Sequence, residues 1–227
     1  MNAPLAILHS GFRRGAAIRP FGVEMANRGF DVHFRHLPGH ADMPLIDPLT
    51  MDAISEQFTR WLDQSESNDR TIIVGESLAG LAALRVAADP PKGLKAVFAI
   101  DPPFTMARQW ALHRLYEGPW DSLHPLIRAY WDIFGARRHG NGQVHFEERD
   151  YRPFLSNLKL PVHILIGGRR SAGPTPTSVV DEEDRAMLGR LDGVTLHVMG
   201  AEVGHLVLDE DRTAAADLIA SLAAQAM

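Results

Sequence analysis

Short apolar runs alternate with longer amphipathic stretches along most of this chain of 227 residues. Apolar runs of strand length occur at residues 5–8, 31–34, 71–74, 94–100, 162–166 and 194–199. Patterns typical of helices occur near residues 14–28, 49–64, 78–88, 178–191 and 210–225. Strands that are separated by helices and are apolar almost throughout predict a mostly parallel sheet covered by helices on both faces, which is an α/β fold.

Residues 102–160 interrupt this alternation and are mostly helical in pattern. They contain ten of the 17 aromatic residues: Phe104, Trp110, Tyr116, Trp120, Tyr130, Trp131, Phe134, Phe146, Tyr151 and Phe154. Ligands of open α/β sheets bind at the carboxyl ends of the strands. We therefore expect residues 1–101 and 161–227 to form the core and residues 102–160 to form a helical cap over that end. The rings either fix the cap in place or, as their number favours, line a pocket for a small apolar substrate.

The composition excludes several kinds of chemistry. The chain has no cysteine, which removes disulfides, thiol nucleophiles and cysteine-ligated metals. Its histidines lack metal-ligand spacing and no phosphate-binding loop occurs, so we expect no metal and no cofactor. A net charge of −5 without basic blocks argues against nucleic acid as a partner. The apolar runs are too short for a membrane helix or a signal peptide, so we expect a cytoplasmic protein, either monomer or homodimer.

One serine stands in a tight turn between a strand and a helix, in Gly75-Glu76-Ser77-Leu78-Ala79-Gly80. A nucleophile elbow has this context and needs small residues two positions before and after the serine, here Gly75 and Ala79. The hydroxyl would stand at a helix N-terminus, where free N–H groups favour developing negative charge. A serine that merely caps the helix is the alternative. We predict that Ser77 is a nucleophile.

Acyl transfer also needs two N–H donors that point at the oxyanion, and a base. The N–H of Leu78 follows the serine directly, and Gly11 in Leu8-His9-Ser10-Gly11 ends an early strand and is the predicted second donor. Among 11 histidines, His205 alone follows Ser77 in a loop between the last strand and the last helix. That place suits a base that must reach the serine from a late loop. An ordinary turn at Gly11 and a solvated His205 are the alternatives.

Four segments resemble the α/β-hydrolase family in their order along the chain. LHSG is similar to its oxyanion loop, HLPGH to its D-x-P-G-H turn, GESLAG to its nucleophile elbow and GAEVGH to its histidine loop. The resemblance covers essentially the whole chain and implies a serine hydrolase of esterase type with a cap. The family's first two strands are missing, which implies a shortened sheet of about six strands.

The acid of the triad departs from the common family pattern. The usual place, after the strand that follows the cap, corresponds to residues 168–174, which contain no Asp or Glu. We predict Asp101, which ends the run 94–100, because some hydrolases of this fold place the acid there. Such a carboxylate would hold the tautomer of the histidine and stabilise the imidazolium. Asp181, Glu182, a dyad without an acid, and a purely capping Asp101 remain as alternatives.

Ser178, with Asp181 three residues later, also predicts a capping box at the start of helix 178–191. The whole pattern predicts a serine hydrolase that forms an acyl-enzyme with a small apolar carboxylic ester, or with a lactone or thioester. A lyase, a carbon–carbon bond hydrolase or a cofactor-free dioxygenase of the same fold is one alternative. A non-catalytic ligand-binding protein that resembles a hydrolase is the other.

Overall fold

The computed structural model describes residues 3–13, 15–64, 70–106, 114–171 and 176–227. Six parallel strands form one sheet in the order β2-β1-β3-β4-β7-β8. They are β1 (Ala3–Leu8), β2 (Phe30–Arg35), β3 (Thr71–Glu76), β4 (Leu94–Ile100), β7 (Val162–Ile166) and β8 (Val194–Val198). The predicted parallel sheet of about six strands is therefore confirmed.

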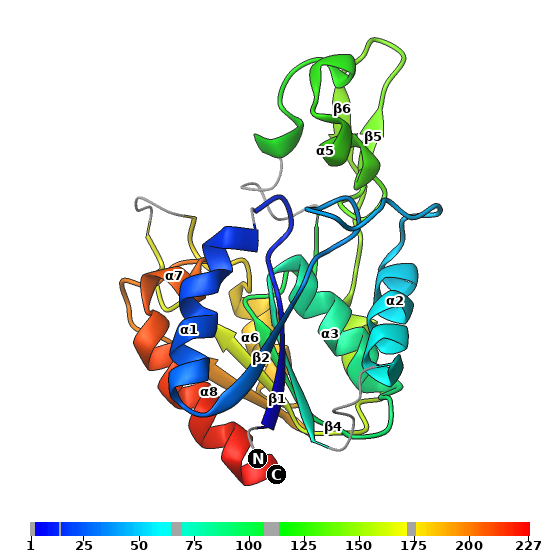
Figure 1. Cartoon of the computed structure of the whole chain (residues 1–227). Coiled ribbons are helices and arrows are strands. Elements are labelled where there is room, and N and C mark those ends of the chain that lie inside the picture. The colour runs from blue at the N-terminus through cyan, green and yellow to red at the C-terminus, as the bar shows by residue number, and fades with distance from the viewer. Residues whose placement is uncertain (1–2, 14, 65–69, 107–113, 172–175) are drawn as a thin grey trace.

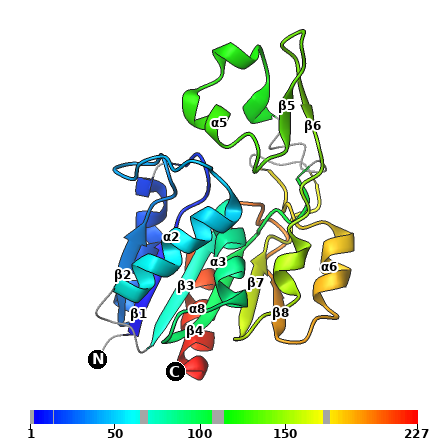
Figure 2. The same cartoon turned by 90° about the vertical axis from the view of Figure 1, so that its right-hand side faces the viewer.

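Helices cover both faces of this sheet, as Figures 1 and 2 show. One face carries η1 (Gly15–Ile18), α1 (Arg19–Asn27), α7 (Val207–Glu210) and α8 (Arg212–Ala226), and the other carries α2 (Met51–Gln64), α3 (Leu78–Ala88) and α6 (Glu182–Leu188). Successive strand side chains point to opposite faces, so Ile72 and Val74 pack with α1 and α8 while Ile73 packs with α2 and α3. None of the helices in the described ranges is long and apolar enough to cross a membrane.

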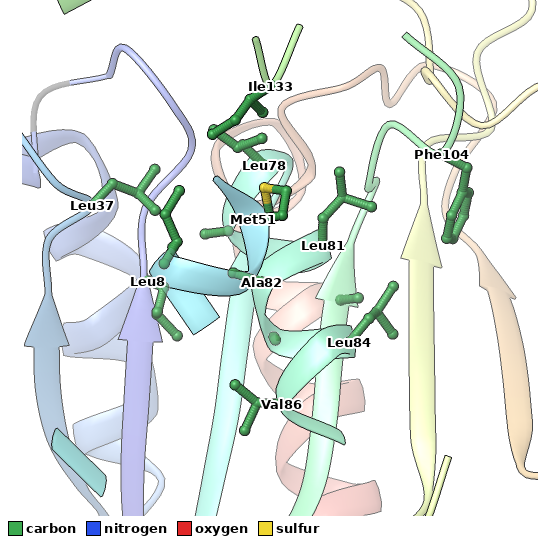
Figure 3. Packing of buried hydrophobic residues seen from close by; sticks show 14 of the residues in the cluster. Leu8, Leu37, Met51, Leu78, Leu81, Ala82, Leu84, Val86, Phe104 and Ile133 are labelled. Carbon is green, nitrogen blue, oxygen red and sulfur yellow. The ribbon is translucent and has the colours of Figure 1, made fainter. Parts of the chain in front are cut away.

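The larger apolar cluster joins the sheet to α2, α3 and the insertion. Figure 3 shows Leu37 beside Leu8 of β1, Ile133 of the insertion near Leu78, and Leu81 further along α3 in the same cluster. All five side chains are almost fully buried. This packing fixes the first turn of α3, and with it the elbow that precedes the helix.

The insertion between β4 and β7 lies beyond the carboxyl ends of the sheet strands (Figures 1 and 2). Its described part contains short helical segments and one antiparallel strand pair: η2 (Arg114–Tyr116), η3 (Trp120–Ser122), α5 (Pro125–Ala129), β5 (Ala136–Arg138), β6 (Val144–Phe146) and η4 (Arg152–Leu155). The β5–β6 pair differs from the helical pattern predicted here. Its signal was the Asn141-Gly142 turn, in which Gly142 takes a φ of +82°. Trp110 lies outside the described residues.

Two helix boundaries also differ from the prediction. The helix predicted from residue 178 begins at Glu182, and its N-cap is Asp181, whose carboxylate accepts the N–H of Asp184 at 2.9 Å. The capping box at Ser178 is therefore wrong, and this hydroxyl is used elsewhere, as described below. The last helix is divided at Asp211 into α7 and α8.

Candidate active site

The turn between β3 and α3 holds Ser77 in a strained conformation. Its φ is +55° and its ψ is −119°, which are uncommon for a residue with a side chain. The Ser77 N–H donates to the carbonyl of Ile100 at 2.7 Å, which ties the turn to β4. A Cβ atom on Gly75 would stand 2.4 Å from the carbonyl oxygen of Ala79, so the turn requires glycine there. These features match the geometry expected of a nucleophile elbow.

The structure brings Ser77, His205 and Asp101 together. Each lies in a loop at the carboxyl ends of the sheet strands. Nε2 of His205 lies 3.0 Å from the hydroxyl oxygen of Ser77, and Nδ1 lies 2.6 Å from Oδ2 of Asp101. A carboxylate only accepts, so Nδ1 carries the proton and Nε2 is free to accept the serine hydroxyl. All three residues are buried. The arrangement can therefore pass a proton from the serine to the histidine.

Asp101 is held from several sides. It follows β4 directly, has a φ of +46°, and donates its N–H to Leu165 of β7 at 2.8 Å. Its carboxylate also accepts the hydroxyl of Ser178 at 2.5 Å and the N–H of Val179 at 3.0 Å. These donors fix the orientation of the carboxylate toward His205. Nothing in the sequence pattern identified them, because one is a backbone group and both lie more than 75 residues away.

The two alternative acids have other contacts. Asp181 caps α6, and the exposed carboxylate of Glu182 forms an ion pair with Arg170. Both ring nitrogens of His205 are already engaged, by Asp101 and Ser77. The structure thus brings Asp101, and neither alternative acid, to the histidine.

Two buried charges set the basicity of His205. Burial alone lowers its pKa, but the hydrogen bond and charge of Asp101, with the charge of Glu76, outweigh burial and raise the pKa above its usual value. Burial also raises the pKa of Glu76, which stands directly before Ser77, while the nearby Arg13 opposes that rise. The sequence pattern identified neither Glu76 nor the donors Ser178 and Val179 as functional candidates.

Gly11 and Leu78, the two predicted oxyanion donors, lie side by side. A Cβ atom on Gly11 would be only 3.3 Å from Cδ2 of Leu78, so the backbone of the β1 loop passes close to the elbow. The next residue, Phe12, donates its N–H to Nε2 of His40 at 3.0 Å. That N–H is therefore engaged, and Gly11 stays the predicted second donor.

An ion-pair network connects the same loop to the elbow. The guanidinium of Arg13 donates to Oε2 of Glu76 at 2.9 Å and also pairs with Asp209 at the start of α7. The Glu76 side chain is 1% exposed, so this pair is hardly screened by solvent. The ion pair links the loop that carries Gly11 to the residue beside Ser77.

In the described part of the chain, no three His, Asp or Glu side chains lie close enough together to hold a metal ion.

His9, which follows β1, is buried, and its Nδ1 lies 2.7 Å from the carbonyl oxygen of Ser10. Burial lowers the pKa of His9 to about 4, so this ring is neutral at neutral pH.

Comparisons with known proteins identify the fold. No family model and no curated protein sequence matches the chain. Among solved structures, an esterase of Pyrococcus furiosus is similar with a TM-score of 0.71 at 16% identity, covering 99% of this chain and 82% of that one. The enol-lactonase of Burkholderia xenovorans is similar with a TM-score of 0.69 at 16% identity, covering 97% of this chain and 91% of that one. The thioesterase domain of the curacin biosynthetic pathway is similar with a TM-score of 0.63 at 15% identity, covering 98% of this chain and 91% of that one. The chain has the α/β-hydrolase fold.

Proposed function

We propose that this chain is a serine hydrolase that acts on small apolar carboxylic esters or related acyl substrates through an acyl-enzyme. The observation that carries the proposal is the continuous hydrogen-bonded line from Ser77 through His205 to Asp101, at the carboxyl ends of β3 and β4. The esterase, thioesterase and lactonase among the similar structures support an acyl substrate. Because the fold hosts several chemistries, the site carries more of the argument than the fold.

The mechanism follows from the geometry. Nε2 of His205 takes the hydroxyl proton as Oγ of Ser77 attacks the carbonyl carbon of the substrate. The N–H groups of Leu78 and Gly11 stabilise the oxyanion. His205 then gives its proton to the leaving oxygen or sulfur, and the acyl group remains on Ser77. Water, deprotonated by His205, attacks the acyl-enzyme, and His205 returns the proton to Oγ of Ser77 as the acyl–oxygen bond breaks and the carboxylic acid leaves.

The insertion supports a preference for apolar acyl groups. Ile133 belongs to the same apolar cluster as Leu78, the residue after the nucleophile. The ring of Phe12, beside Gly11, lies 5.3 Å from the ring of Tyr130 and 5.4 Å from that of Phe134. Apolar and aromatic groups of the insertion therefore lie above both predicted oxyanion donors, where they can exclude water from the reaction.

Labelling with a fluorophosphonate tests the proposal. We expect rapid labelling of the wild-type protein, with the adduct on Ser77 in a peptide mass spectrum. We expect no labelling of Ser77→Ala and a strong loss of labelling with His205→Ala. The control is Ser156→Ala, which changes the exposed serine at the C-cap of η4 and should be labelled like the wild type. Equal labelling of the wild type and Ser77→Ala would refute the nucleophile.

A substrate series then separates hydrolysis from the other chemistries of the fold. Nitrophenyl esters of two to ten carbons, a thioester and a lactone are supplied to the wild type. A short-lived acyl adduct of Ser77 in quenched-flow mass spectra supports the hydrolase, since a lyase or a cofactor-free dioxygenase forms none. Ligand binding without labelling or turnover would instead indicate a binding protein.

A further inference from the structure

A histidine outside the triad, His40, contacts the loop that carries Gly11. The N–H of Phe12 donates to Nε2 of His40 at 3.0 Å, across 28 residues of sequence. Nδ1 of the same ring lies 3.1 Å from the carbonyl oxygen of Pro38. An amide N–H only donates and a carbonyl only accepts, so both ring nitrogens have fixed roles. His40 must carry its proton on Nδ1 and be neutral for both bonds to exist.

Phe12 needs such a partner because its backbone is strained. Its φ is +60°, a conformation that costs an ordinary side chain roughly 1–2 kcal/mol. Two groups oppose that cost: the bond to His40, and the packing of the Phe12 ring against Tyr130 and Phe134. Tyr130 also donates its hydroxyl to the carbonyl of Pro38 at 2.8 Å, so the turn at Pro38 joins the insertion and His40.

We propose that neutral His40 is a positioning residue that holds Phe12 and thereby directs the N–H of Gly11 toward the oxyanion. This inference rests on the proposed function. It also explains why Gly11 and not Phe12 is the donor: the amide of Phe12 is used to anchor the loop. The amides of Gly11 and Phe12 meet at the Cα of Gly11, a residue with little conformational restriction of its own, so loss of the anchor at Phe12 frees the N–H of Gly11 to turn away.

Protonation of His40 removes the anchor, because Nε2–H would then face the N–H of Phe12, donor against donor. Three groups face this ring. The centroid of the buried His9 ring lies 5.0 Å from that of His40, the centroid of the Tyr130 ring lies 5.8 Å away, and His36 is nearby. None of them is an anion that would favour imidazolium. Burial, aided by the charge of His36, lowers the pKa of His40, so the anchor persists at neutral pH and is lost on acidification.

Three variants test the role of His40. His40→Ala removes the acceptor, whereas His40→Gln retains an amide oxygen that can reach the N–H of Phe12. His33→Ala is the control, since this half-exposed ring of β2 bonds to the nearby Asp31 at 3.0 Å. The readouts are the rate constant of Ser77 phosphonylation, kcat and KM for one ester, and the melting temperature.

We expect His40→Ala to lower the phosphonylation rate and kcat about 10- to 100-fold with little change in KM, below the 10²–10³ seen when an oxyanion donor is removed outright. His40→Gln should recover most of the rate, and His33→Ala should match the wild type. An unchanged rate in a folded His40→Ala, or equal loss in His40→Gln and His40→Ala, would overturn the role of His40 alone. A wild type that is never phosphonylated would overturn both proposals.

A spectroscopic measurement on the wild type needs no variant to fold. Imidazole nitrogen resonances distinguish a protonated Nδ1 from an unprotonated Nε2, and a through-bond coupling to the amide of Phe12 reports the bond directly. We expect both signals at pH 7.5 and their loss on acidification together with the phosphonylation rate. A His40 ring protonated on Nε2 at neutral pH would contradict the proposal.

Discussion

The exchange Asp101→Asn tests the least usual feature of the site, the acid at the end of β4. The carboxylate accepts three hydrogen bonds: from Nδ1 of His205 at 2.6 Å, from Val179 N–H at 3.0 Å and from the Ser178 hydroxyl at 2.5 Å. The first two reach Oδ2 and the third reaches Oδ1. An asparagine offers one oxygen and one NH₂ group in their place.

The structure determines which way that asparagine turns. The N–H of Val179 cannot accept a hydrogen bond, whereas the hydroxyl of Ser178 can rotate and accept one from NH₂. The amide oxygen therefore takes the place of Oδ2, and Nδ1 of His205 keeps both its proton and a partner. What is lost is the negative charge opposite the imidazolium. Removing one partner of a buried ion pair costs about 3–5 kcal/mol, which corresponds to a fall in kcat of about 10²–10⁴ at ~1.4 kcal/mol per tenfold.

The assay is ester hydrolysis with a titration of active sites, so that loss of folded protein is separated from loss of rate. Asp181→Asn and Glu182→Gln are the controls. Asp181→Asn retains a capping side chain, and Glu182 is an exposed partner of Arg170. Both should turn over at close to the wild-type rate. The reasoning fails if Asp101→Asn, correctly folded, stays within a few-fold of the wild type, or if Asp181→Asn loses as much.

Three further exchanges probe the surroundings of the triad. Glu76→Gln removes a charge that raises the pKa of His205, so the base stays neutral to lower pH and the acid limb of kcat/KM should move to lower pH; a shift upward would contradict this. Ser178→Ala removes one charge-assisted bond to Asp101 and should lower kcat/KM about tenfold, or ~1.4 kcal/mol, in steady-state kinetics. Gly75→Ala places a Cβ 2.4 Å from the carbonyl oxygen of Ala79 and should reduce the free energy of unfolding by about 1–3 kcal/mol in urea titrations. Gly189→Ala is the control and should change this free energy little, because the atom nearest to its new Cβ lies 3.6 Å away.

The strands could be predicted because a parallel sheet buries both faces. Leu94–Ile100 and Val162–Ile166 were predicted with the bounds that the structure has, since their apolar runs end at Asp101 and Gly167. The elbow was predictable for a similar reason. The close approach of Gly75 to Ala79 imposes small residues at fixed spacing, and that requirement is visible in the sequence.

Polar contacts between distant segments could not be predicted from the sequence. Ser178 and Asp181 have the spacing of a capping box, but the hydroxyl of Ser178 bonds to Asp101 and the helix begins four residues later. A charged carboxylate is the stronger acceptor, and only the three-dimensional fold brings it to Ser178. The bond from Phe12 to His40 and the pair of Arg13 with Glu76 are of the same kind.

The absence of an acid after β7 has a physical explanation in the order of the strands. β4 lies between β3, which carries Ser77, and β7, so an acid at the end of β4 is one strand closer to the nucleophile than the usual position. Residues 168–174 have no acid to supply, and the segment that follows them supplies hydrogen-bond donors from Ser178 and Val179 instead. A second carboxylate that reached Nδ1 of His205 from this segment would stand beside that of Asp101, and two like charges so close would oppose each other. The missing acid is therefore what a site with Asp101 as its acid requires of this loop.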